Sequence, residues 1–342
     1  MISYTDIIQQ NCDSVSPVNW WPRFAYHFTD ATNAVSIIAS GNLYSRGEAT
    51  SKNLMRNENA SRSIIDITSS EITTKVRFYF RPMTPTQFRN EGFKLERSRY
   101  DGTNIPVPVF FLFDLEKLLS TPGVQFSEQS QAGYGSEMLQ GVDAFSLLNF
   151  NRIYSNGSMD DMTKKYRQAE ILYPDTLQID SYIKYILCRN GTEKSTLLNL
   201  LRDEQPERLK RFEPIIKVCP NDMFYRNGLY IEEILCSDGK LNIRFSDDNK
   251  RLDYHNKYCQ EESPLNEDDR IEVEVHFVWY SADEKEVDQF LCQTDIGYIG
   301  QNHLTFTGVT QRENGPYLKT TVRFEGKVMA VARNSLMESE LL

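Results

Sequence analysis

The sequence has neither long hydrophobic runs nor paired cysteines. Its longest apolar stretches, such as residues 107–112, stop well short of the roughly 20 residues that span a bilayer. No positively charged and then apolar leader opens the chain, so we expect a soluble protein that is made and kept in the cytosol. The 6 cysteines form no C-x-x-C motif, and they therefore indicate neither a disulfide framework nor a zinc motif.

One group of side chains deserves a separate test as a metal site. Cys236, His255 and Cys259 can in principle share a metal ion. Their spacing matches no established ligand pattern, so ordinary thiols are the favoured interpretation. We expect no metal.

Positive charge is also scarce. The chain has 38 Lys and Arg against 48 Asp and Glu, which gives a formal net charge of −10. This balance argues against a protein that coats nucleic acid by bulk electrostatics, because such proteins have strongly basic domains. An enzyme with a local basic groove remains compatible with it.

The length of 342 residues predicts two domains, because single cores stop growing at about 250–300 residues. We expect an α+β protein. Residues 1–185 are predicted to form a mixed α/β domain of short strands, residues 186–220 a helical connector, and residues 221–342 a β-sandwich-like accessory domain.

In the first half, a strand over residues 24–28 is predicted to lead into a helix that ends near Ser40, with Gly41 as its C-terminal cap. Residues 76–80 and 107–113 are further strands. The latter is apolar on both faces, which predicts a central position in a sheet. Residues 45–74 are polar with little periodicity, which predicts a long functional loop with room for one helical turn.

In the second half, leucines at helical spacing over residues 192–218, interrupted by Pro206, predict two helices. Apolar residues then recur at every second position over 271–279, which is typical of a half-buried strand. Asp238-Gly239 and Glu325-Gly326 each lie between strand-like segments and predict two-residue hairpins. We therefore expect the C-terminal domain to be all-β.

Three motifs together resemble one enzyme family. They are Tyr26-His27-Phe28-Thr29 followed by Asn33, then residues 78–82 (Phe-Tyr-Phe-Arg-Pro), and Arg167-Gln168-Ala169-Glu170. The sequence over roughly residues 20–180 resembles the DarT family, bacterial toxins that transfer ADP-ribose from NAD onto nucleic-acid bases. The last motif is the most specific of the three.

The resemblance implies that Glu170 is the catalytic glutamate. Cleavage of the nicotinamide glycosidic bond generates a ribose cation of oxocarbenium character. A carboxylate near that ribose stabilises the positive charge, and it can also accept the proton that a base nitrogen loses. Without the flanking motif, Glu170 would be an ordinary surface glutamate at the start of a strand.

The same resemblance implies the residues that bind NAD: His27, Thr29, Asn33, Tyr79, Phe80 and Arg81. An imidazole can bond a ribose hydroxyl, and a hydroxyl at a helix start can join backbone amides near a pyrophosphate. The two aromatic residues would give a flat wall for nicotinamide, and Arg81 would reach a phosphate. Their alternative roles are core packing and closure of the strand end.

The family also uses an arginine in the loop before the strand at 76–80, where a fixed cation holds the acceptor base. Arg62 lies nearest that position, with Arg56 as a substitute. The sequence over residues 126–130 is only weakly similar to a turn of the family that carries a second histidine or asparagine. The acceptor base can therefore differ from the family's thymine.

A basic and aromatic cluster precedes the glutamate: Lys164, Lys165, Tyr166 and Arg167. Such residues suit a phosphate backbone with one stacked base, so we expect them to bind nucleic acid. The alternative is a solvated basic helix end. Residues 190–196 resemble a phosphate-binding loop, but Glu193 stands where a glycine is required, which excludes that function.

The favoured hypothesis is a toxin-type mono-ADP-ribosyltransferase in a toxin–antitoxin or anti-phage defence system. It would use NAD to modify single-stranded DNA, the family default, with mRNA as a close rival. A neutralising antitoxin would dock on the C-terminal β-domain. The alternatives are a protein-directed transferase and a module that binds NAD or ADP-ribose without turnover.

Overall fold

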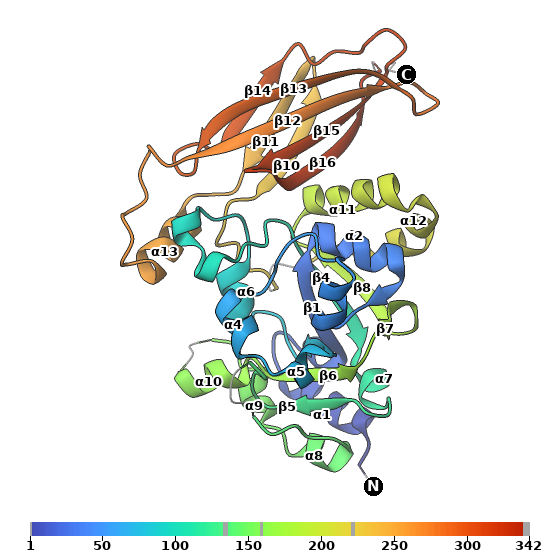
Figure 1. Cartoon of the computed structure of the whole chain (residues 1–342), viewed down its shortest axis with the longest axis vertical. Helices are drawn as coiled ribbons and strands as arrows, with labels where there is room; N and C mark the ends of the chain where they lie inside the picture. Colours follow the sequence, from blue (N-terminus) through green and yellow to red (C-terminus); the bar gives the residue numbers. More distant parts are fainter. Residues whose placement is uncertain (1, 133–135, 158–159, 220–222, 338–342) are drawn as a thin grey trace.

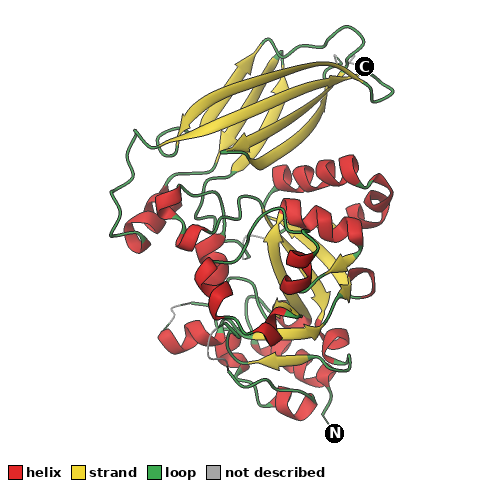
Figure 2. Ribbon diagram, viewed as in Figure 1, coloured by secondary structure: helices red, strands yellow, loops and turns green. Residues whose placement is uncertain are grey.

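The computed structural model describes residues 2–132, 136–157, 160–219 and 223–337. It has a larger part, in which helices surround a seven-stranded sheet, and a smaller part built almost entirely of strands (Figures 1 and 2). The N-terminus lies at the far end of the larger part, and the C-terminus lies on the smaller one. The mixed α/β half and the β-rich half are both confirmed.

The seven-stranded sheet has the order β5-β6-β3-β1-β4-β8-β9. All neighbouring pairs are antiparallel except β8 and β9. The strands are β1 (Phe24–Asp30), β3 (Lys75–Tyr79), β4 (Pro108–Asp114), β5 (Gln125–Ser127), β6 (Glu170–Pro174), β8 (Ile183–Cys188) and β9 (Ile216–Val218). A separate pair joins β2 (Asn42–Leu43) to β7 (Leu177–Gln178).

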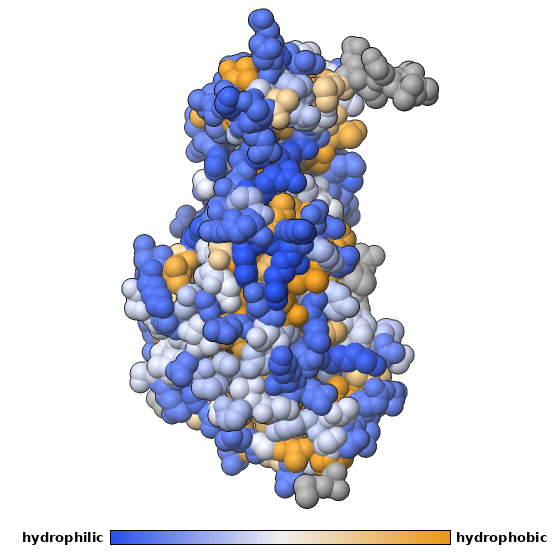
Figure 3. Space-filling view, turned by 90° about the vertical axis from the view of Figure 1, so that its right-hand side faces the viewer, coloured by the Kyte–Doolittle hydropathy of each residue, from blue (hydrophilic) through white to orange (hydrophobic). Residues whose placement is uncertain are grey.

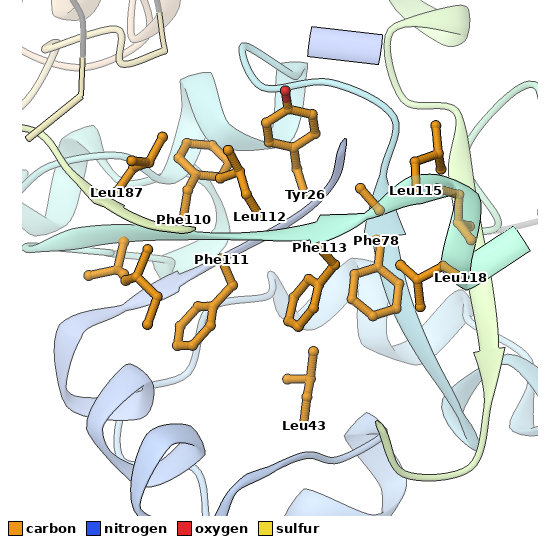
Figure 4. Close-up of a cluster of buried hydrophobic side chains, with 14 of the residues drawn as sticks. Tyr26, Leu43, Phe78, Phe110, Phe111, Leu112, Phe113, Leu115, Leu118 and Leu187 are labelled. Carbon is orange, nitrogen blue, oxygen red and sulfur yellow. The ribbon is translucent and has the colours of Figure 1, made fainter. Parts of the chain in front are cut away.

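Strand β4 lies near the middle of this sheet, as its uninterrupted apolar sequence predicts. Phe110 and Leu112 point to one side of the strand, and Phe111 and Phe113 point to the other (Figure 4). All four side chains are buried. Hydrophobic side chains thus cover both faces of the sheet, which fixes the position of neighbouring β1.

The predicted helix after β1 is confirmed as α2 (Ala31–Ser40). The Asp30 carboxylate accepts a hydrogen bond from the Thr32 amide at 2.9 Å, and Gly41 ends the helix with φ of 70°. The other helices of this part are α1 (Tyr4–Ser14), α6 (Pro85–Asn90), α7 (Leu115–Leu119), α8 (Val142–Ser146), α9 (Phe150–Ile153) and α10 (Asp161–Tyr166).

The polar stretch over residues 45–74 differs from the predicted loop. It contains three short helices, α3 (Arg46–Ser51), α4 (Arg62–Ile67) and α5 (Ser70–Thr73). Serine precedes each of them, and Ser45 and Ser69 accept hydrogen bonds from backbone amides of the first turn. The helices bury few side chains, so they leave little hydrophobic periodicity in the sequence.

The two predicted helices near residues 192–218 are confirmed as α11 (Gly191–Glu204) and α12 (Pro206–Phe212). They do not form a separate connector, because β8 and β9 on either side of them belong to the seven-stranded sheet. Leu197, Leu201 and Phe212 pack in the same core as β4. A boundary at residue 185 therefore cuts through one sheet, and the larger part extends to about residue 225.

The smaller part consists of two sheets, as a sandwich-like domain requires. One sheet has the order β10-β11-β14 and the other has the order β13-β12-β15-β16. Their bounds are β10 (Ile231–Ser237), β11 (Lys240–Phe245), β12 (Arg270–Tyr280), β13 (Glu286–Gly297), β14 (His303–Thr307), β15 (Tyr317–Phe324) and β16 (Lys327–Ser335). Both two-residue hairpins are confirmed, with positive φ at each turn residue.

Helix α13 (Asn249–Tyr258) departs from the all-β prediction for this half. It packs against the larger part, where the Ser98 hydroxyl and His255 Nδ1 lie 2.8 Å apart. In return, Phe93 and Leu95 of the larger part join the core of the β-domain. The two parts therefore exchange short segments across their junction.

Most of the surface is hydrophilic on the face drawn in Figure 3, and apolar side chains there form small separate groups. Among the described residues, no helix combines the length and the apolar character needed to cross a membrane.

Candidate active site

A cavity lies where β1 and β3 separate. These strands pair at Tyr26 and Tyr79, and beyond that pair residues 27–29 of β1 and 75–77 of β3 line a cavity of about 420 Å³. Side chains from α2, α3 and α6 complete its wall. Its volume falls within the range of about 300–1,000 Å³ that is usual for small-molecule sites.

Glu170, the first residue of β6, is fully buried directly behind this cavity. Its carboxylate accepts hydrogen bonds from Arg77 Nη2 at 2.6 Å and Arg77 Nε at 3.1 Å. It also accepts bonds from the Ser130 hydroxyl and the Gln131 amide, both at 3.2 Å. These four donors fix the carboxylate in one orientation, as electrostatic catalysis requires.

Arg77 is the residue that separates Glu170 from the cavity. Its side chain is 29% exposed and lines the cavity wall. Burial opposes the charge of the guanidinium, but Glu170 beside it raises the pKa of Arg77 above its usual value. A permanent cation therefore faces the cavity at the carboxylate.

The sequence interpretation missed Arg77, although a signal was available. Val76 and Phe78 are buried in the core, so strand alternation turns Arg77 and Tyr79 to the other face of β3. Tyr79 lies directly opposite Glu170 in the strand register. A prediction of this register would have placed Arg77 next to the glutamate.

His27 lines the cavity on β1, and its Nδ1 donates a hydrogen bond to the Arg77 carbonyl at 3.3 Å. Burial lowers the pKa of His27 to about 4. The ring is therefore neutral near pH 7 with its proton on Nδ1. Nε2 is then an acceptor, which suits a bond from a ribose hydroxyl.

Thr29 and Asn33 also line the cavity, and both bond to the loop before α4. The Thr29 hydroxyl accepts a bond from Asn59 Nδ2 at 2.8 Å. Asn33 Oδ1 accepts bonds from the Arg56 and Asn57 amides, and Asn33 Nδ2 donates to the Asn57 carbonyl at 2.7 Å. Asn33 thus holds the loop that forms one wall of the cavity.

Tyr79, the last residue of β3, and the two residues after it have different environments. Tyr79 lines the cavity. Phe80 is fully buried and packs against Phe145, 6.1 Å between ring centroids, so it lies in the core and not in the wall. Arg81 is 1% exposed and donates to the Pro82 and Ile153 carbonyls at 2.9 and 3.0 Å. It is a structural residue, and it is not free to reach a phosphate.

The structure places neither expected arginine beside Glu170. Arg62 is exposed at the start of α4, where its neighbours Ser61 and Ile64 line the cavity. Arg56 donates to Glu204 of α11 at 2.6 Å. The position beside the carboxylate belongs to Arg77, and Arg62 itself is not among the residues that line the cavity.

The basic cluster before Glu170 divides in two. Lys164 lines the cavity and pairs with Asp161 at 2.9 Å, and Lys165 is exposed on the same helix. Tyr166 is partly buried against the core. Arg167 is 5% exposed and donates to the Ser155 hydroxyl and the Gly157 carbonyl at 3.2 and 3.1 Å. The two lysines face solvent, whereas Arg167 holds the preceding loop.

The described ranges contain no group of three His, Cys, Asp or Glu side chains that could hold a metal ion. His255 Nε2 instead donates a hydrogen bond to the Ser263 carbonyl at 2.9 Å, and its Nδ1 lies 2.8 Å from the Ser98 hydroxyl.

Comparison with known proteins decides the family. The sequence model of DarT, described as ssDNA thymidine ADP-ribosyltransferase, matches residues 26–225, which is more than half of the chain. This protein belongs to the DarT family. It is accordingly an NAD-dependent ADP-ribosyltransferase, and NAD is the donor of ADP-ribose.

Solved structures of DarT proteins are similar at low identity. Thermus sp. 2.9 DarT in complex with carba-NAD+ has 15% identity and a TM-score of 0.46 over 60% of this chain and 98% of that one. Thermus sp. 2.9 DarT in complex with ADP-ribosylated ssDNA has 16% identity and a TM-score of 0.46 over 60% and 97%. Thermosipho africanus DarTG in complex with ADP-ribose has 16% identity and a TM-score of 0.46 over 63% and 53%. No curated protein matches the chain.

Proposed function

We propose that this DarT protein transfers ADP-ribose from NAD onto a base of single-stranded DNA, with Glu170 and Arg77 at the reacting ribose. The observation that carries the proposal is the buried carboxylate of Glu170, held by four donors directly behind the cavity wall. A surface glutamate at a strand start would not be held in this way. Glu170 lies within residues 26–225, the range that matches the DarT family.

NAD supplies an activated ribose, whose C1′–nitrogen bond to nicotinamide breaks as positive charge develops on the ring. The Glu170 carboxylate stabilises that charge, because it is already oriented and is shielded from bulk water. A ring nitrogen of the acceptor base then forms the new bond to C1′. The proton on that nitrogen passes to Glu170 through the Ser130 hydroxyl, which lines the cavity and donates to the carboxylate at 3.2 Å.

Residues of the cavity wall would hold the donor. His27 Nε2 accepts from a ribose hydroxyl, and Tyr79 gives the aromatic surface for nicotinamide. Thr29 and Asn33 keep the 56–59 loop against the ligand. Phe80, Arg81 and Arg167 contribute through packing and loop contacts only.

Arg77 has a second role in this proposal. It is the cation closest to Glu170, so an acceptor base that approaches the carboxylate also approaches the guanidinium. A fixed cation stabilises a base that loses a proton. Arg77 therefore takes the role that the sequence motif assigned to Arg62.

Thymine is the proposed acceptor because the family description names thymidine. Ser130 occupies the segment in which the sequence departs from the family turn, and it contacts Glu170. Transfer to a different base or to mRNA would mean that this segment has altered the acceptor specificity. A labelled protein would indicate the protein-directed alternative.

The experiment is incubation of the purified chain with labelled NAD and, separately, single-stranded DNA, RNA of the same sequence and a protein lysate. Oligonucleotides that lack thymine test the acceptor base. Glu170→Gln removes the charge, and Glu313→Gln is the matched control, since Glu313 is exposed on the β-domain. Label on thymine-containing DNA that is lost only in Glu170→Gln supports the proposal; label on RNA or protein alone contradicts it.

We further propose that the chain is a cytosolic toxin of a toxin–antitoxin or anti-phage defence system, with a neutralising protein that adds a strand to β13. This strand lies at the edge of its sheet, and Val287, Phe290 and Leu291 on it are 40–56% exposed. Expression in bacterial cells should stop growth, whereas the Glu170→Gln variant should not. Equal growth with both would contradict a toxic activity.

A further inference from the structure

Helix α13 lies outside residues 26–225 that match the family, yet it carries a distinctive face. One side of the helix carries two lysines and two tyrosines, which are Lys250, Tyr254, Lys257 and Tyr258. Successive members are four, three and one residues apart, and this spacing places them on the same side. Both lysines are exposed, and Tyr258 is 54% exposed. Asp253 flanks this face at its edge.

The face is fixed against the larger part of the molecule. The Tyr258 ring lies 4.9 Å from the Phe88 ring of α6, and the Tyr254 ring lies 5.3 Å from it, centroid to centroid. Lys250 Nζ donates to the Tyr225 carbonyl at 3.4 Å. The orientation of Tyr258 toward α6 is therefore set by packing.

From α6 the surface continues into the active-site cavity. Arg89 follows Phe88 and lies over the Tyr100 ring at 3.9 Å, and both residues line the cavity. Lys164 of α10 also lines it. Figure 1 shows α13, α6 and α10 along one side of the molecule.

Electrostatics agrees with this proximity. Asp161 is the main cause of the raised pKa of Lys164, and Tyr258 and Arg89 also act on it. Tyr258 of α13 and Arg89 of α6 therefore both act electrostatically on Lys164 of α10. Exposed cations and exposed aromatic rings alternate from the cavity to the C-terminal half.

We propose that Lys250, Lys257 and Tyr258 bind the stretch of single-stranded DNA that flanks the acceptor base, after it has passed Arg89 and Tyr100. Lysines contact phosphates, and a half-exposed ring offers a surface on which a base can stack. The C-terminal half thereby becomes part of the DNA-binding surface. This inference rests on the proposed function, because it requires single-stranded DNA as the acceptor.

The surface predicts a dependence on acceptor length. An oligonucleotide of about 4 nucleotides can fill the cavity without reaching α13, whereas one of about 16 nucleotides covers it. Loss of the stacking ring should lower kcat/KM for the long acceptor by about fivefold or more. The logarithm of the binding constant for a single strand falls linearly with the logarithm of the salt concentration, and loss of each lysine should reduce the size of that slope by about 0.7.

The test compares wild type with Tyr258→Ala and Lys257→Glu on both acceptors. Lys257→Glu removes an exposed ammonium that lies 5.3 Å from the Tyr258 ring, but it leaves the ring contacts of Tyr258 with Phe88 and Tyr254 in place. It therefore remains informative if Tyr258→Ala folds poorly. Tyr317→Ala and Lys285→Glu are matched controls on exposed side chains of the β-domain. NAD hydrolysis without DNA is measured for each variant.

We expect kcat/KM to fall for the long acceptor alone, with short-acceptor transfer and NAD hydrolysis unchanged and the controls like wild type. An equal fall in kcat/KM on both acceptors, or no fall on either, would overturn the inference. Transfer by the wild type would still support the proposed function in that case. If wild type modifies neither acceptor, the proposed function fails and this inference fails with it. If a purified binding protein, and not DNA, loses affinity in the variants, α13 is a protein-docking surface instead.

Discussion

Replacing Arg77 with methionine tests the ion pair at the centre of the proposed site. The change removes both guanidinium bonds to Glu170, at 2.6 and 3.1 Å, and keeps an apolar stem of similar length. Glu170 retains its bonds from Ser130 and Gln131. We expect a folded protein with an incompletely held carboxylate.

The cost in stability follows from the environment. Breaking a fully buried pair costs about 3–5 kcal/mol, and losing one bond to a charged group costs about 1.5–3 kcal/mol. Because Arg77 is 29% exposed toward the cavity, water can replace part of the guanidinium. We therefore expect a loss of about 2 kcal/mol, which lowers Tm by roughly 3 °C for a chain of 342 residues.

The cost in activity should be larger. Removing one preorganised group that stabilises transition-state charge typically lowers kcat by about 100-fold or more. Arg77→Lys keeps the charge but loses the paired geometry, so its kcat should fall by about tenfold. Thermal unfolding and single-turnover transfer from NAD to single-stranded DNA measure the two effects separately.

Two other arginines serve as comparators. Arg56 makes a similar two-bond pair with Glu204, but its side chain is 45% exposed, so Arg56→Met should cost less than about 1 kcal/mol and leave kcat within about twofold. Arg62→Met should also leave kcat nearly unchanged. A large loss in Arg62→Met together with normal activity in Arg77→Met would refute the assignment of Arg77.

Three further outcomes follow from the structure. Burial holds the pKa of His27 near 4, below its ordinary 6.5, so the unfolded chain binds a proton first as the pH falls. The free energy of unfolding should therefore decline from pH 6.5 toward pH 4. Urea unfolding should show a loss of about 1–2 kcal/mol at pH 5 relative to a His27→Gln variant. Gly228→Ala should cost about 2 kcal/mol or more in the same assay, because its Cβ would lie 2.6 Å from the Gly92 backbone carbon. Ser130→Ala should lower kcat by about threefold to tenfold, since it removes one neutral donor from Glu170, and unchanged transfer would show that this bond is dispensable.

Local signals predicted much of the fold. β4 is recognisable because a strand buried on both faces needs an uninterrupted apolar sequence. Both hairpins of the β-domain follow from glycine-containing turns with positive φ. Helix α13 was missed because it is fixed by contacts with α6, which no local pattern records.

The site was predictable only where it depends on short motifs. His27 and Tyr79, which the motifs singled out, both line the cavity. Phe80 is buried in the core against Phe145, and Arg81 lies past the end of β3, where carbonyl contacts with Pro82 and Ile153 hold its guanidinium away from the cavity. The Arg77–Glu170 pair joins residues 93 positions apart, so it depends on the register of β3 with β6.

The most direct test of the account is transfer of label from NAD to single-stranded DNA by wild type, Glu170→Gln and Glu313→Gln. The account predicts that wild type and Glu313→Gln label the DNA, whereas Glu170→Gln binds NAD but transfers no label. If the Glu170→Gln variant transferred label as fast as the wild type, this result would contradict the central role given to the buried carboxylate.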